Sequence, residues 1–140
     1  MPPFISRRQV RFAETDMAGI VHFVNFYRWM EEAEHEFFRS LGLRIMEQLS
    51  DGDYLGWPRV SASCSFEAPA RYEDEIEVRI HCERIGFKSL NYAIEIWRDT
   101  TRLAHGRLKT ACCICKGDGT LASVEIPANY RQRIEDAFQA

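Results

Sequence analysis

Residues 15–27 of the chain read Thr15-Asp16-Met17-Ala18-Gly19-Ile20-Val21-His22-Phe23-Val24-Asn25-Phe26-Tyr27, which sets one carboxylate in a glycine-containing turn directly before a strongly amphipathic segment. Beyond the turn, apolar side chains recur at helical spacing on one face, namely Phe26, Met30, Ala33, Phe37 and Leu41, with Trp29 beside them. Charged side chains fall largely on the other face, namely Arg28, Glu31, Glu32, Glu34 and Arg39. The spacing predicts a helix that runs to about Leu41, ends at Gly42 and buries one whole side.

Asp16 stands where the chain enters this helix, and that place suits it to chemistry on a carbonyl group. The first N–H groups of a helix lack partners within it and carry a partial positive charge, which stabilises an oxygen that acquires negative charge. A carboxylate beside such donors can act as a general base or as a nucleophile next to an oxyanion site. The alternative from the residues alone is that Asp16 only caps the helix or shapes the turn.

Composition bounds the class of protein. The chain has 140 residues and a formal net charge of −3, which fits one domain over residues 1–140 whose core needs neither disulfide nor metal. The basic residues are scattered, so we expect no nucleic-acid partner. No apolar run is long enough for a signal peptide or a membrane span. We therefore expect a cytoplasmic protein whose five cysteines stay reduced.

Neither a metal site nor a redox site is expected. The run Cys112-Cys113-Ile114-Cys115 contains a C-x-x-C spacing, but no second pair follows at zinc spacing. The segment is also extended, whereas a redox C-x-x-C opens a helix, so it predicts a strand in the core. The four histidines show no ligand spacing, and they are His22, His35, His81 and His105. We expect no cofactor.

The rest of the chain alternates with the period of β-strands. A first strand is predicted around Val10 and Phe12, and residues 43–57 are mixed. Long one-sided strands are predicted over residues 60–66, 76–82, 90–97 and 103–115, and a short helix after Pro127. A helix with a single apolar stripe is best buried when an antiparallel sheet curves around it, which is an α+β arrangement. The second face of the sheet, which carries Trp97, then favours self-association.

This order of elements, together with Asp16-x-x-Gly19-Ile20-Val21 and Asn25-Phe26, resembles the hotdog-fold acyl-CoA thioesterases, above all the 4-hydroxybenzoyl-CoA thioesterase type. The likeness continues through Glu67-Ala68-Pro69-Ala70-Arg71-Tyr72-Glu73-Asp74 and Gly86-Phe87-Lys88-Ser89-Leu90, and so covers nearly the whole chain. It implies a hotdog fold, in which a strongly curved antiparallel sheet wraps around one long central helix. It also implies an acyl-CoA substrate and a homodimer, or a homotetramer built as a dimer of dimers, with active sites at the subunit interface.

The resemblance further implies the site. Asp16 takes the place of the family's catalytic carboxylate, as nucleophile or general base, and the backbone N–H of Phe23 is the oxyanion donor. Substrate contacts are expected from Gly19, His22, Asn25, Phe26 and Lys88. For the CoA phosphates the candidates are Arg59, Arg71, Arg84 and Lys88. Some family members carry a histidine seven residues after the aspartate, where this chain has Phe23. His22 lies one residue earlier, about 100° around a helix, so no catalytic role is carried over to it.

The sequence leaves alternatives open for the acyl group and for the reaction. Small residues face the helix, Ala33 on its own stripe and Ala104, Gly106 and Thr110 on the long strand, and they predict a shallow site for a short or aromatic acyl group. One alternative is a hotdog enoyl-CoA hydratase or dehydratase that pairs Asp16 with His22. Another is a non-catalytic acyl-CoA-binding module. A cysteine nucleophile is disfavoured, because no cysteine lies in a turn or at a helix start.

Overall fold

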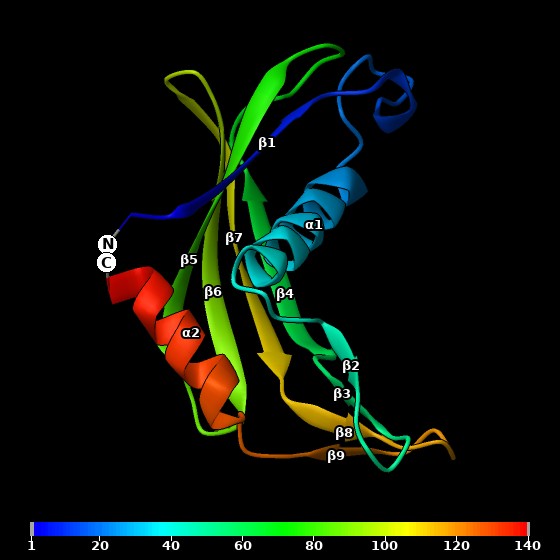
Figure 1. Cartoon of the computed structure of the whole chain (residues 1–140). Coiled ribbons are helices and arrows are strands. Elements are labelled where there is room, and N and C mark those ends of the chain that lie inside the picture. Colours follow the sequence, from blue (N-terminus) through cyan, green and yellow to red (C-terminus); the bar gives the residue numbers. More distant parts are fainter. Residues whose placement is uncertain (1, 140) are drawn as a thin grey trace.

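The structure, a computed structural model, describes residues 2–139 and consists of two antiparallel sheets and two α-helices (Figure 1). The main sheet has the strand order β1-β5-β6-β7-β4. Its strands are β1 (Phe4–Gln9), β5 (Glu75–Ile85), β6 (Ser89–Arg98), β7 (Thr101–Ala111) and β4 (Arg59–Phe66). The small sheet joins β2 (Met46–Gln48), β3 (Tyr54–Gly56), β8 (Cys113–Cys115) and β9 (Leu121–Ser123) in that order. The helices are α1 (Val24–Ser40) and α2 (Ala128–Gln139), and a 3-10 turn, η1, covers Phe12–Glu14.

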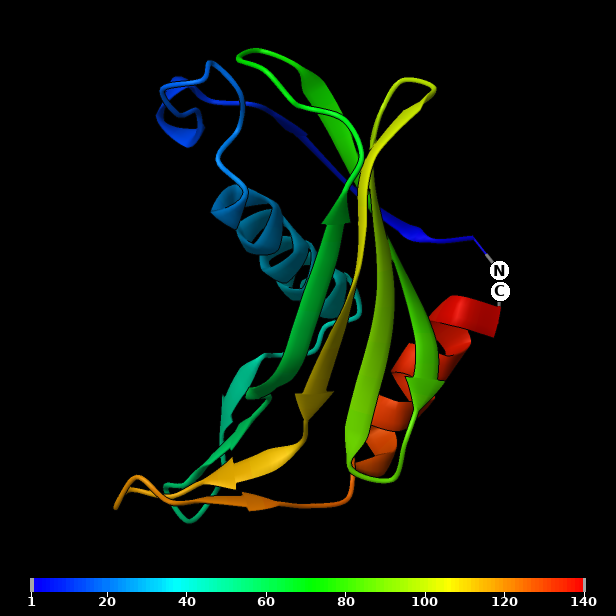
Figure 2. The ribbon, with the colours of Figure 1, turned by 180° about the vertical axis from the view of Figure 1, so that it is seen from behind.

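The long strands curve around α1, and both helices lie on the same side of the main sheet (Figures 1 and 2). Helix α2 covers the C-terminal half of α1, where the Phe37 and Phe138 rings are 4.9 Å apart and those of Phe38 and Tyr130 are 6.2 Å apart. These four aromatic side chains are all buried. The predicted α+β arrangement, a curved antiparallel sheet around one long helix, is therefore confirmed. In the described part of the chain, neither helix has the length and apolar character to cross a membrane.

The apolar stripe of α1 is buried as predicted, but one residue assigned to its polar face is not exposed. Glu34 is only 2% exposed, because its carboxylate accepts two hydrogen bonds from Arg59, at 2.9 and 3.0 Å. Although burial opposes the charge of Arg59, the hydrogen bonds and the charge of Glu34 raise its pKa above the ordinary value. Arg59 is thus engaged inside the protein and is not a free cation for a CoA phosphate.

A close approach of α1 to the sheet depends on Gly106. A Cβ atom at this position would collide with the carbonyl oxygen of Ser63 and would lie 3.2 Å from the sulfur of Met30. The side chain of Met30 therefore occupies the space that a larger residue on β7 would fill. The predicted tight packing of small residues against the helix is confirmed at this point.

The structure departs from the predicted strands at the first strand and at the end of the long strand predicted over residues 103–115. Val10 is buried, but it follows β1, and Phe12 belongs to η1 and is 74% exposed. The strand predicted over residues 103–115 divides at Cys112, whose N–H donates to Lys88 O at 2.7 Å in register with the main sheet, while its carbonyl oxygen accepts the Val124 N–H at 2.9 Å in register with the small sheet. The chain then enters the small sheet, of which β2, β3 and β9 were not predicted.

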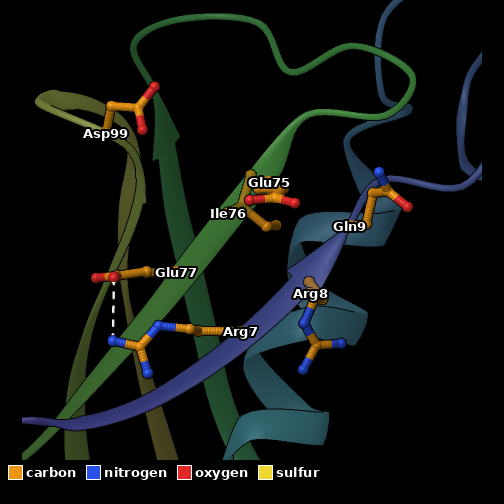
Figure 3. A pocket seen from close by; sticks show the side chains of 7 residues that line it. All are labelled: Arg7, Arg8, Gln9, Glu75, Ile76, Glu77 and Asp99. Atoms are coloured by element: carbon orange, nitrogen blue, oxygen red, sulfur yellow. Dashed lines mark ion pairs between the residues drawn. The ribbon is translucent and has the colours of Figure 1, made fainter.

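The outer face of the main sheet carries ion pairs. The Arg79 guanidinium lies 4.6 Å above the Trp97 ring, and Arg102 pairs with Glu95 at 2.9 Å. A groove of about 410 Å³ lies beside β1 and β5, where Arg7 points toward Glu77 at 3.4 Å (Figure 3). Trp97 is therefore partly covered within one chain, and the apolar character predicted for this face is reduced.

Candidate active site

The turn that carries Asp16 is a tight hairpin closed by backbone hydrogen bonds. Asp16 N–H donates to Ile20 O at 2.9 Å, Gly19 N–H donates to Asp16 O at 3.0 Å, and Thr15 pairs with Val21. Gly19 has a φ of +77°, a backbone conformation that glycine adopts without strain. The carboxylate of Asp16 accepts the Ala18 N–H at 2.9 Å, remains exposed and makes no ion pair among residues 2–139. The turn thus fixes the backbone of Asp16 and leaves its carboxylate accessible.

The first turn of α1 leaves one backbone donor free. Val24 N–H donates to His22 Nδ1 at 3.3 Å, and Asn25 N–H donates to His22 O at 2.9 Å. For the N–H of Phe23, by contrast, the described residues offer no acceptor. This N–H stands at the positive end of a 17-residue helix, where an oxyanion is stabilised.

Asp16 and Phe23 line the same pocket, which has a volume of about 510 Å³. Its lining consists of Asp16, Ile20, Val21, Phe23, Phe26, Phe66, Glu67, Ala68 and Pro69. Three phenylalanines form one wall: the ring of Phe66 meets that of Phe26 at 5.3 Å and 80°, and that of Phe23 at 6.2 Å and 79°. Two of them are far from buried, since Phe23 is 55% and Phe66 47% exposed. The pocket is therefore lined by the residue with the free carboxylate, by the residue with the free backbone N–H and by an apolar aromatic wall.

The structure brings only some of the predicted site residues together. Asp16, Phe23 and Phe26 meet in the pocket. Gly19 and His22 lie next to it in sequence but serve the turn and the helix cap, and the His22 ring stacks on Phe23 at 4.9 Å.

The other two predicted contacts are placed differently. Asn25 is only 8% exposed, and its side chain donates to Glu14 O at 2.8 Å. Lys88 lies in the turn between β5 and β6, and this turn is at the opposite end of the long strands from the segment that joins β1 to α1 (Figures 1 and 2). Within one chain Lys88 therefore does not reach the pocket.

Two residues near the pocket were missed by the sequence analysis. Phe66 is the last residue of β4. Its alternation with polar neighbours predicts a strand, but it does not predict that the side chain of Phe66 is exposed. Glu14 stands two residues before Asp16, and its carboxylate accepts the indole N–H of Trp29 at 2.7 Å. Only its closeness to Asp16 in the sequence could have drawn attention to it.

A second carboxylate, Glu67, lies at the rim of the pocket but is bound to other groups. Arg102 Nε and His105 Nδ1 each lie 2.8 Å from Glu67 Oε1. The hydrogen bonds from these two residues lower the pKa of Glu67. Glu67 therefore stays ionised and engaged, and Asp16 is the carboxylate of the pocket that remains unpaired within residues 2–139.

Burial makes several of the cysteine thiols poor nucleophiles. Burial raises the pKa of Cys64 to about 11, and it raises the pKa values of Cys82 and Cys112 to about 12. At neutral pH such groups are protonated and weakly nucleophilic. None of the described cysteines lines the Asp16 pocket, and among residues 2–139 no three His, Cys, Asp or Glu side chains are grouped so as to hold a metal.

Comparisons with known proteins agree along most of the chain. Residues 18–105 match the family model described as the thioesterase superfamily. A 4-hydroxybenzoyl-CoA thioesterase of Pseudomonas sp. strain CBS-3 is 28% identical over 130 residues, which are 89% of this chain and 92% of the relative.

Solved structures are similar as well. A gentisyl-coenzyme A thioesterase superposes with a TM-score of 0.79 at 32% identity, over 91% of this chain and 98% of the other. A 1,4-dihydroxy-2-naphthoyl-CoA thioesterase from Synechocystis gives a TM-score of 0.82 at 28% identity, over 95% and 96%.

Proposed function

The chain belongs to the thioesterase superfamily, and from that premise we propose that it hydrolyses the thioester of a short or aromatic acyl-CoA, with Asp16 as the reacting carboxylate. Membership confirms the predicted hotdog fold and the enzyme class, a thioester hydrolase. The acyl group, the site residues and the assembly are parts of the proposal. We include in it that residues 1–140 act as one hotdog thioesterase domain.

The observation that carries the proposal is that Asp16 lines one pocket together with Phe23, the residue whose backbone N–H has no acceptor among the described residues. The thioester carbonyl oxygen accepts the Phe23 N–H, and in comparable sites one such donor is worth about 2.7–4 kcal/mol in the transition state. Asp16 then attacks the carbonyl carbon, which releases the CoA thiolate and leaves a mixed anhydride that water hydrolyses to the acid and free Asp16. Alternatively, Asp16 takes a proton from a water molecule that attacks the same carbon.

The aromatic wall supports a compact or aromatic acyl group. Edge-to-face contact with an aromatic ring is worth about 0.5–1.5 kcal/mol beyond simple burial, and both Phe23 and Phe66 offer exposed ring surface. Farther along α1, Met30 is fully buried and packs against Gly106, which supports a shallow site with little room for a long alkyl chain. Similar proteins act on 4-hydroxybenzoyl-CoA, gentisyl-CoA and 1,4-dihydroxy-2-naphthoyl-CoA, which are all aromatic.

The open edge of β4 supports a homodimer, which a dimer of dimers would extend to a homotetramer. β4 is the last strand of the main sheet, and most of its side chains are exposed, with Val60 at 57% and Phe66 at 47%. Antiparallel pairing with β4 of a second copy would extend the sheet and cover apolar surface. It would also bring the Lys88 turn of one copy toward the Asp16 pocket of the other, where an acyl-CoA could span both.

The cysteines support a cytoplasmic location. All five are free thiols in the structure, which is typical of a reducing compartment. We place the enzyme in the cytoplasm on this ground.

A panel of acyl-CoA substrates tests the function. Thiol release is measured with a thiol reagent for benzoyl-, butyryl- and palmitoyl-CoA. We expect kcat/KM to be at least about tenfold higher for the first two substrates than for palmitoyl-CoA, a difference of about 1.4 kcal/mol in binding of the transition state. A steady rise from butyryl- to palmitoyl-CoA would contradict the acyl assignment. Hydration of crotonyl-CoA without thiol release would favour the hydratase alternative, and binding without turnover the non-catalytic one. Light scattering that gives a monomer at micromolar concentration would contradict the assembly.

A further inference from the structure

The carboxylate of Glu14 connects the Asp16 turn to the interior of α1. Its Oε2 accepts the indole N–H of Trp29 at 2.7 Å, and its Oε1 accepts the backbone N–H of Arg11 at 2.7 Å. Trp29 is fully buried on the apolar stripe of α1. The position of Glu14 is therefore fixed relative to the helix that presents the Phe23 N–H.

The main chain of Glu14 makes a second connection to the same helix. Its carbonyl oxygen accepts the backbone N–H of His22 at 2.9 Å and the side-chain amide of Asn25 at 2.8 Å. Glu14 and His22 lie on the two arms of the Asp16 hairpin, so these hydrogen bonds hold the two arms together at the base of the hairpin. Glu14, two residues before Asp16, thus accepts four hydrogen bonds.

We propose that Glu14 is the positioning residue of this enzyme: through Trp29 and Asn25 it sets the distance between the Asp16 carboxylate and the Phe23 N–H. The inference rests on the proposed function, since it concerns the two groups that act on the thioester. Glu14 is not among the residues that line the Asp16 pocket, so it acts through other groups. It acts because Asp16 stands on an exposed hairpin that is tied to α1 at its base, and a reacting group displaced by about 1 Å can lose about 100-fold in rate.

A carboxylate suits this role better than a neutral side chain. The indole of Trp29 and the N–H of Arg11 are both donors only, so the residue between them must offer two acceptors. An ionised carboxylate does so, and hydrogen bonds to a charged acceptor are shorter and stronger than neutral ones. A glutamine has one acceptor oxygen and can satisfy one of the two donors.

Steady-state kinetics with benzoyl-CoA on the whole protein test the inference. We expect Glu14→Ala to lower kcat about 10- to 100-fold with KM changed less than about threefold, because pocket contacts are kept while the reacting groups are misplaced. Glu14→Gln should lie between this variant and the unaltered protein. Trp29→Phe, which removes the indole donor, should lower kcat in the same way. The double variant Glu14→Ala/Trp29→Phe should be no slower than the slower single variant, since both changes break one connection.

Glu32→Ala is the matched control. Glu32 lies on the exposed face of α1, and its carboxylate accepts Arg8 Nη1 at 2.8 Å. Its loss removes another carboxylate that ties α1 to the rest of the chain, and kcat should stay within about twofold, as for exposed sites away from the chemistry. Each variant is assayed below its own melting temperature, checked by circular dichroism. If Glu14→Ala does not fold, Glu14→Gln and Trp29→Phe decide the question.

The results separate this inference from the proposed function. Turnover by the unaltered protein and its loss in Asp16→Asn test the function alone. If Asp16→Asn is inactive while Glu14→Ala keeps kcat within twofold, the positioning role is wrong and the function stands. A purely structural role would lower the melting temperature without changing kcat, or would give additive losses in the double variant. Either result would overturn the proposal.

Discussion

The two ends of α1 are both rich in aromatic side chains, yet one end is closed and the other is open. At the C-terminal end Phe37 and Phe38 are 1% exposed, because α2 packs over them through Tyr130 and Phe138. At the N-terminal end Phe23 is 55% exposed, and the described chain places no helix above it. The same residue type therefore builds core at one end and pocket at the other, and the difference lies in what the rest of the chain brings to each end.

The charged groups follow the same division. In the middle of α1, Glu34 is buried and held by two hydrogen bonds from Arg59. At the open end the Asp16 carboxylate is exposed and accepts a single backbone N–H. A carboxylate that is enclosed in an ion pair supports the fold, whereas one that is left accessible beside a free N–H can react. Substitutions at the two ends should therefore separate stability from activity.

The largest effect is expected at the closed end. Phe38→Ala removes a buried ring that contacts both Trp57 and Tyr130, and such deletions cost about 3–5 kcal/mol of unfolding free energy. Urea denaturation followed by circular dichroism measures this loss. Below the transition, kcat of the folded enzyme should be nearly unchanged. A kcat that falls tenfold or more in the folded state would break the comparison.

At the open end Asp16→Asn should remove activity and spare the fold. The amide keeps the shape of the side chain but lacks the charge, and we expect kcat to fall at least about 100-fold. The melting temperature should shift little, because the side chain is exposed. His22→Ala is the comparison variant, since His22 caps Val24 and should cost far less. An equal loss in both variants would return support to the hydratase alternative.

Phe66→Ala should change substrate preference by a smaller factor. The ring forms two edge-to-face contacts in the pocket wall, each worth about 0.5–1.5 kcal/mol. We expect kcat/KM for benzoyl-CoA to fall about two- to tenfold more than kcat/KM for acetyl-CoA. The two substrates are compared on the same preparation. An equal fall for both would mean that Phe66 only shapes the backbone.

The smallest effect is expected from Cys64, which lies two residues before Phe66. Its raised pKa of about 11 means that at pH 8 only about 0.1% of the thiol is ionised. Iodoacetamide should label Cys64 at least about tenfold more slowly in the native protein than in urea, with the native rate rising as the pH approaches 11. Cys64→Ser should leave kcat within about twofold. Fast labelling that abolishes turnover at pH 8 would revive the cysteine alternative.

How much of this was predictable depends on how local each feature is. The α1 stripe and the Asp16 turn were predicted because both follow from residues within about one helix length. Glu34 was wrongly assigned to the exposed face of α1. Periodicity describes one helix alone and cannot show that an arginine of β4 binds the carboxylate. The strands β2 and β3 are three residues each, too short for alternation to be recognised.

The candidate site could likewise be predicted from the sequence only in part. Asp16, Phe23 and Phe26 lie within eleven residues of one another, and the family motif marks them. Phe66 enters the pocket because the end of β4 lies beside the start of α1, where its ring meets those of Phe23 and Phe26. The contact between Glu14 and Trp29 joins residues fifteen positions apart through a reversal of the chain. Neither follows from a local pattern.

The two edges of the main sheet differ, and this bears on how far copies of the chain can associate. At one edge Arg8 anchors β1 to α1 through Glu32 at 2.8 Å and Glu36 at 3.4 Å. At the other edge the eight residues of β4 pair with β7 on one side, and among the described residues no strand pairs with the outer side. If β4 pairs with β4 of a second copy, the contact is self-complementary and uses up the accessible edge of both molecules. Strand addition at β4 then terminates at two subunits, because neither copy has a second β4 edge to offer.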